Sequence, residues 1–135
     1  MAYIDNELIF CQDKSITAAV SPATTSETLS DVIDLGTNGP VLHPLFIDVK
    51  LPTPFTAGNI SKITLQSSAV ANDFSSAVDE MAVIPPATQT STMTLAQFYA
   101  PIKTGNRYVR LKFDGASSPA GGKVTAFMTP GATVV

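Results

Sequence analysis

The segment RYVRLKFD, residues 107–114, decides the fold class. Its apolar residues Val109, Leu111 and Phe113 are separated by single basic residues, so the polarity of the side chains alternates. Successive side chains of a β-strand point to opposite faces, and a period of two therefore predicts a strand with one face in a core and one in solvent.

Working outward from this segment, three more stretches show the same alternation clearly and four show it weakly. The clear ones are residues 45–51, 60–67 and 123–129, and the weaker ones are 15–20, 31–35, 78–84 and 93–102. Prolines and glycines separate these stretches. About eight short strands without a helix between them predict an all-β fold, an eight-stranded antiparallel β-sandwich of the jelly-roll type.

Two segments also carry a helix signal, because a threonine is followed three residues later by Glu or Gln, the spacing of a capping box. These pairs are Thr24 with Glu27 and Thr94 with Gln97. Helices at residues 24–36 and 94–99 therefore remain an alternative. We favour strands, and we expect the second segment to form a hairpin with residues 107–113. Residues 115–122, rich in Ser, Pro and Gly, are expected to form a connection.

Length and composition limit the class of protein. A chain of 135 residues is expected to form one domain, residues 1–135. Eight basic and eleven acidic side chains give a net charge of −3, which argues against a nucleic-acid partner. No apolar stretch approaches the roughly 20 residues of a membrane-spanning helix. The N-terminus lacks the features of a secretory signal, so we expect the product to stay in the reducing cytoplasm after synthesis, as the lone Cys11 also suggests.

Residues able to carry out catalysis are scarce. His43 is the only histidine and Cys11 the only cysteine, so we expect no catalytic residue, no metal site and no cofactor. A small hydrolase that uses Cys11 and His43 as a nucleophile pair remains as an enzymatic alternative.

Two groups of residues are candidates for a protein interface. Residues 1–14 form an apolar N-terminal arm that either packs on the protein's own core or docks onto another subunit. The other group is the polar side of the segment at 107–114. The candidate residues are Tyr3, Ile4, Leu8 and Phe10 on the arm, and Arg107, Tyr108, Arg110 and Lys112 on the segment. A glycan-binding β-sandwich module, with Tyr99 or Tyr108 as a stacking platform, is the alternative.

In their order and spacing, several segments resemble the small capsid cement proteins of tailed phages, of the type found in a short-tailed Bordetella phage. The segments are residues 3–10, 32–36, 45–49, 63–68, 105–111 and 122–126. The resemblance implies a jelly-roll domain on the outside of an icosahedral virion, assembled in the host cytoplasm. It also implies two partners, the major capsid protein and further copies of the chain in a symmetric dimer or trimer.

Charge and polarity suggest how such a protein would attach. Arg107, Arg110 and Lys112 would align the chain against acidic patches of the capsid. The apolar arm would add buried contact area, or a strand at the edge of a neighbouring sheet. The chain departs from the family pattern at residues 84–86 and 93–99, so contacts of those loops are not transferred.

Overall fold

The computed structural model describes residues 9–16, 26–34, 45–70, 73–100 and 106–129, and this part of the chain is built from antiparallel β-strands without a helix. Its nine strands are β1 (Ile9–Ser15), β2 (Ser26–Leu29), β3 (Ile33–Asp34), β4 (Leu45–Thr53), β5 (Ala57–Ser68), β6 (Val78–Val83), β7 (Met93–Ala100), β8 (Tyr108–Ala120) and β9 (Lys123–Thr129). One sheet has the order β1-β9-β4-β7. The other has the order β2-β8-β5-β6, with β3 also paired to β8.

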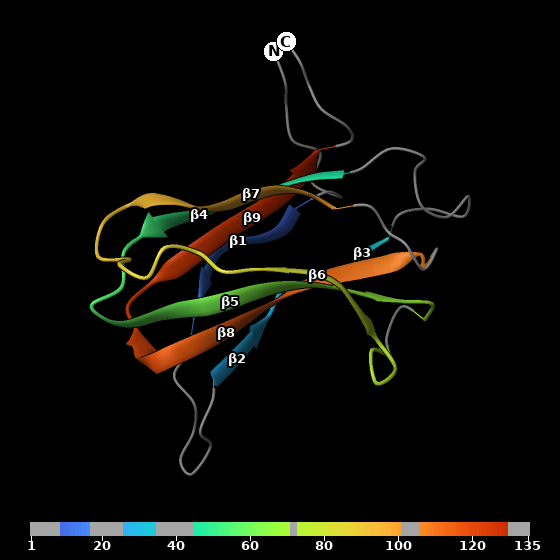
Figure 1. Ribbon diagram of the computed structural model, residues 1–135, viewed down its shortest axis with the longest axis horizontal. Coiled ribbons are helices and arrows are strands. Elements are labelled where there is room, and N and C mark those ends of the chain that lie inside the picture. Colours follow the sequence, from blue (N-terminus) through green and yellow to red (C-terminus); the bar gives the residue numbers. More distant parts are fainter. Residues whose placement is uncertain (1–8, 17–25, 35–44, 71–72, 101–105, 130–135) are drawn as a thin grey trace.

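The two sheets lie one above the other, and the apolar core fills the space between them (Figure 1). The first sheet contributes Phe10, Ile47, Val49, Leu51, Val124, Ala126 and Met128, and the second contributes Ile33, Ile60, Ile63, Leu65, Val109, Leu111 and Phe113. Each fully buried aliphatic or aromatic side chain contributes about 1.5–3 kcal/mol relative to exposure. The prediction of an all-β fold with two antiparallel sheets is confirmed, whereas the jelly-roll topology stays a prediction.

Most of the predicted strands are present. The segments at 45–51, 60–67, 78–84, 93–102 and 123–129 correspond to β4, β5, β6, β7 and β9. Neither segment with a helix signal is helical in its described residues: the first contains β2 and β3, joined by residues 30–32, and the second lies in β7. The expected strand at 15–20 is represented only by Ser15, the last residue of β1, since residues 17–20 lie outside the described part.

The predicted hairpin between residues 93–102 and 107–113 is wrong. Strand β7 pairs with β4, whereas β8 pairs with β2, β3 and β5 in the other sheet. The chain therefore crosses from one layer to the other between these strands. Alternation shows which side chains of a strand face the core. It does not show whether two strands belong to the same sheet or to opposite sheets, because the pattern is the same in both cases.

The expected connection at residues 115–122 is also wrong, because β8 continues to Ala120. Its extension pairs with the beginning of β5, Ala57 opposite Ala120 and Asn59 opposite Ala116, with a register shift (a β-bulge) between these two pairs. On the other side of β8 the described pairing with β2 reaches Gly115, which lies opposite Ser26. Pro119, which has no N–H to donate, lies in the irregular part of the pairing with β5, a position at which a strand tolerates proline. Pairing with β5 overrides a local composition that favours a loop.

Residues 9–14 are not part of a detached arm. They belong to β1, which pairs with β9 at the edge of the four-stranded sheet. Phe10 has no exposed surface and Cys11 is 4% exposed, so both side chains belong to the core. The assignment of Phe10 to an exposed interface is corrected accordingly. Tyr3, Ile4 and Leu8 lie outside the described residues.

The side chain of Gln89 holds the segment between β6 and β7 against β5. It is 2% exposed, and its Oε1 accepts a hydrogen bond of 2.8 Å from the backbone N–H of Ile60. Its Nε2 donates to the carbonyl oxygens of Ile60, at 2.9 Å, and Pro86, at 2.7 Å. The amide thus satisfies backbone groups that would otherwise be buried without partners.

Candidate binding faces

Strand β8 places three of the predicted interface residues on one surface. Val109, Leu111 and Phe113 point into the core with no exposed surface. The residues that alternate with them, Tyr108, Arg110 and Lys112, therefore lie on the outer face of the five-stranded sheet, where each is half-buried. We call this surface the arginine face, which comprises Asp34, Gln66, Phe74, Asp79, Arg107, Tyr108, Arg110 and Lys112.

Arg107 is held by a forked ion pair with Asp34. Its Nε and Nη2 donate to Oδ1 and Oδ2 of that carboxylate at 2.5 and 2.7 Å. The hydrogen bonds that Arg107 donates to Asp34 raise the pKa of Arg107 above its already high usual value. The guanidinium carbon also lies 5.2 Å from the centre of the Tyr108 ring. This geometry orients Arg107, but its charge is already matched within the chain, so it is less suited to the predicted electrostatic role than Arg110.

Arg110 is held by a different set of contacts. Its Nε donates to Oε1 of Gln66 at 3.0 Å, and Nε2 of Gln66 donates to Oδ1 of Asp79 at 3.0 Å. The guanidinium carbon lies 4.2 Å from the centre of the Phe74 ring, in cation–π geometry. Phe74 belongs to the turn between β5 and β6, where Asp73 accepts hydrogen bonds from the backbone and side chain of Ser75. Strands β5, β6 and β8 are thus linked through side chains on this face.

The outer face of the four-stranded sheet has a different character. We call it the aromatic face, which comprises Ile9, Phe46, Asp48, Lys50, Thr94, Gln97, Tyr99 and Phe127. The register places Phe46 opposite Tyr99, and Asp48 opposite both Gln97 and Phe127. Half of the Tyr99 surface is exposed, and its ring packs at 56° against Phe46, with 5.0 Å between the ring centres.

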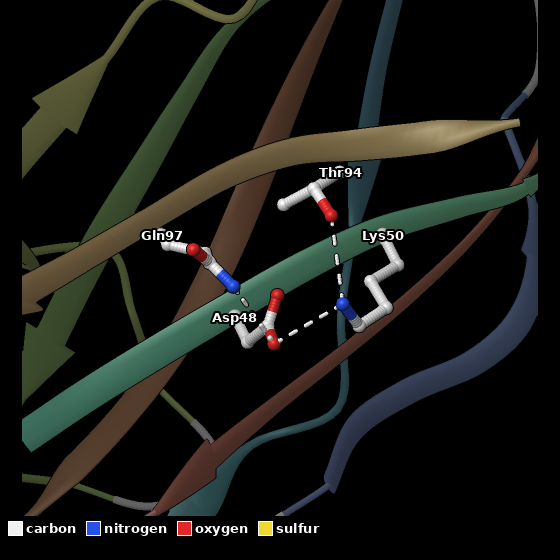
Figure 2. A network of polar contacts seen from close by, with 4 residues as sticks. All are labelled: Asp48, Lys50, Thr94 and Gln97. Atoms are coloured by element: carbon white, nitrogen blue, oxygen red, sulfur yellow. Dashed lines mark hydrogen bonds and ion pairs between the residues drawn. The ribbon is translucent and has the colours of Figure 1, made fainter. Parts of the chain in front are cut away.

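A small polar network lies on the same face, and Figure 2 shows its members Asp48, Lys50, Thr94 and Gln97. Oδ2 of Asp48 is 3.4 Å from Nζ of Lys50 and accepts a 3.4 Å hydrogen bond from Nε2 of Gln97. Lys50 also donates to Oγ1 of Thr94 at 3.5 Å. All three contacts are long, and the side chains of Lys50, Thr94 and Gln97 are exposed.

Asp48 is more buried than its place on an outer face suggests. The alternation of residues 45–51 correctly predicts that it points away from the core, yet the residue is 7% exposed and its Oδ1 is buried without a hydrogen-bond partner. Leaving such an acceptor unsatisfied costs about 1–3 kcal/mol. The sequence shows Asp48 and Tyr99, but not that β4 and β7 pair and bring them to one surface.

Cys11 does not have the environment of a catalytic nucleophile. The side chain is 4% exposed, and its Sγ donates to the carbonyl oxygen of Val124 at 3.6 Å. Burial raises the pKa of the thiol from its ordinary value of 9.0 to about 11. The thiolate, which is the reactive form, is therefore scarce at neutral pH. His43, the predicted partner, lies outside the described residues.

We expect this burial to appear as a pH dependence of stability. The unfolded thiol loses its proton near pH 9.0 and the folded thiol at about 11, so the folded state binds more protons between these values. The free energy of unfolding should fall there by about 1.4 kcal/mol per pH unit because of Cys11. Urea titrations at pH 8–10.5 should show a shallower fall in Cys11→Ala, and equal slopes would contradict the assignment. Native Cys11 should also resist alkylation at pH 8.

Neither a metal-ion cluster nor a membrane-spanning helix is found in the part of the chain that the structure describes. No three His, Cys, Asp or Glu side chains there are arranged to hold a metal ion. None of its elements is a helix able to cross a bilayer.

Fold and surface together define a two-sheet, all-β protein in which one outer face carries Arg107 and Arg110 and the other carries aromatic side chains. The chain matches no protein-family model, and a search of curated proteins finds no significant match. The arginine face and the aromatic face are therefore the candidate binding surfaces of this chain.

Proposed function

We propose that the chain is a structural virion protein that decorates an icosahedral phage capsid and cements it by bridging major capsid protein subunits on the outer surface. The observation that carries this proposal is the arginine face, on which Arg107 and Arg110 are oriented by contacts with their neighbours. The resemblance of the strand segments to phage cement proteins supports the choice of partner.

The composition of the arginine face suits a protein interface. Arginine and tyrosine are among the residues that most often dominate binding energies at such interfaces. Holding a side chain in place before binding reduces the entropy lost on association. Asp34 does this for Arg107, and Gln66 and Phe74 do it for Arg110. Each guanidinium has five N–H donors, so both arginines retain donors beyond those used within the chain.

The size of the face sets what one copy can contribute. Strands β2, β8, β5 and β6 hold 4, 13, 12 and 6 residues. With strands about 4.8 Å apart and about 3.4 Å per residue, the face covers roughly 570 Å², which is less than the roughly 800 Å² that one partner contributes to a standard interface, so several copies must act together. Many symmetry-related copies, themselves joined as dimers or trimers, would add avidity. In this mechanism the chain raises the barrier to separation of capsid subunits and performs no reaction.

The experiment compares heads assembled with wild-type chain, Arg110→Glu and Lys123→Glu, where Lys123 is an exposed lysine of β9 in the other sheet. Occupancy is measured by quantitative gel analysis of purified particles, and the fold of each variant by circular dichroism. We expect Arg110→Glu to weaken binding about tenfold or more, because it reverses a charge at the centre of the face, and Lys123→Glu to leave it unchanged. Equal occupancy for both variants would refute docking through the arginine face.

Cementing itself requires a second measurement. Heads that lack the chain should still assemble, and they should release their genome at a lower temperature than decorated heads. Addition of purified wild-type chain should restore the release temperature, whereas Arg110→Glu should not. Release at the same temperature with and without the chain would contradict the cement function.

A further inference from the structure

From the aromatic face we infer a second binding site, for a neutral saccharide. In this site the ring of Tyr99 stacks on the sugar, and Asp48 and Gln97 form hydrogen bonds with its hydroxyl groups. The inference does not rest on capsid binding. The aromatic and arginine faces are the outer surfaces of opposite sheets, so a chain docked through the arginine face still presents Tyr99 to the outside.

Tyr99 has the properties of a stacking platform. Half of its surface is exposed although it lies on a regular strand, and its ring is braced by Phe46 at 5.0 Å between ring centres. An aromatic side chain offers a large apolar surface with little conformational freedom to lose. The C–H groups on one side of a pyranose ring form a matching apolar surface. Tyr108 is less suitable, because it is half-buried and lies against Arg107.

Polar groups lie at the right separation from this ring. Gln97 is two residues before Tyr99 on β7, on the same face, and Asp48 is opposite Gln97 on β4. Two residues along a strand span about 7 Å, which is close to the width of a sugar ring with its hydroxyl groups. A sugar stacked on Tyr99 therefore has hydroxyl groups above Gln97 and Asp48.

The hydrogen bonding of the Asp48 carboxylate indicates the chemistry of the ligand. Its Oδ1 is a buried acceptor without a donor, whereas Lys50 and Gln97 both approach Oδ2 at 3.4 Å. A hydroxyl group is a donor and an acceptor at once. The long contacts of Gln97 and Lys50 with Oδ2 can give way to a sugar O–H that donates to the Asp48 carboxylate, while the sugar oxygen accepts from Gln97 or Lys50. Lys50 balances the charge of Asp48, so the site favours a neutral sugar over a charged one.

The test uses the purified chain and a panel of glucose, galactose, mannose, N-acetylglucosamine and their β-linked disaccharides. Saturation-transfer NMR should show magnetisation passing to the C–H protons of at least one sugar, with a Kd of about 1 mM, which is ordinary for a single shallow platform. Tyr99→Ala should weaken this binding about tenfold or more, and Gln97→Ala several-fold. Tyr99→Phe, which keeps the ring, and Tyr108→Ala, on the opposite sheet, should bind as the wild type does.

Thermal unfolding of each variant establishes that it is folded. Absence of saturation transfer from the whole panel at 50 mM sugar, or binding that survives Tyr99→Ala, would overturn the saccharide site. If the wild-type chain bound no sugar and Tyr99→Ala lowered capsid occupancy, the saccharide site would also be overturned. The aromatic face would then be a protein contact. Sugar binding by a chain that does not bind capsids would refute the proposed function and leave the saccharide site standing.

Discussion

Replacing Gly58 by alanine is expected to lower the free energy of unfolding by about 3–5 kcal/mol, as measured by urea denaturation. Gly58 has a φ of +66°, where a β-carbon is strained. That β-carbon would also lie 2.6 Å from both the carbonyl oxygen of Ala116 and the nitrogen of Pro119. Both atoms belong to the backbone of β8, so the strand itself would have to move.

Gly121→Ala is the matched control. Gly121 also has a positive φ, +82°, but the nearest atom to an added β-carbon is Oγ1 of the exposed Thr56 side chain, at 2.8 Å. That side chain can rotate away, at the loss of its exposed 3.1 Å hydrogen bond to the carbonyl oxygen of Ala120. The expected cost is therefore the backbone strain of about 1–2 kcal/mol plus at most about 1 kcal/mol for this bond. If Gly58→Ala proved no more destabilising than Gly121→Ala, close packing of β5 against β8 would not explain why position 58 requires glycine.

Phe10→Ala is expected to cost about 3–5 kcal/mol of unfolding free energy, the usual range for a buried phenylalanine. The side chain has no exposed surface and is among the largest fully buried ones in the described part of the chain. The strand is also attached through its backbone, since the carbonyl oxygen of Phe10 accepts a 2.9 Å hydrogen bond from the N–H of Asp31. Removing the ring leaves a cavity at the edge of the core that β1 cannot close without leaving β9.

Gln12→Ala, at an exposed position of the same strand, should change stability by less than about 0.5 kcal/mol. Phe10→Leu keeps most of the apolar volume, so its loss of unfolding free energy should lie between those of Phe10→Ala and Gln12→Ala. This variant still gives a measurable value if Phe10→Ala does not fold. A Phe10→Ala chain with wild-type stability would instead favour the original expectation that this side chain is an interface residue.

The alternation of apolar and polar residues within one segment predicted the buried side chains of the clearest strands correctly. The alternation of Val109, Leu111 and Phe113 identified both a strand and its buried face, and it placed Arg110 on the outside. The apolar character of residues 1–14 did not decide the place of Phe10, which was assigned to an interface and lies in the core. An apolar side chain near a chain end is equally consistent with packing on the protein's own core and with packing on a partner.

The candidate sites were only partly accessible to such reasoning. Arg107 and Arg110 could be identified as candidates because they are basic residues on one predicted strand. Their partners could not, since Asp34 and Gln66 are 73 and 44 residues away in the chain. The aromatic face was missed for the same reason, because Tyr99 was expected on a strand paired with residues 107–113 rather than with β4.

Alternation and composition, taken alone, determined that this chain forms strands and which side chains of the clearest strands face the core. They did so because the period of a strand and the hydrophobic effect act on each segment separately. Strand partners, the extension of β8 to Ala120 and the two outer faces were decided only by the tertiary structure. Pairing depends on contacts between distant segments that must all be satisfied at once, and no single segment contains that information.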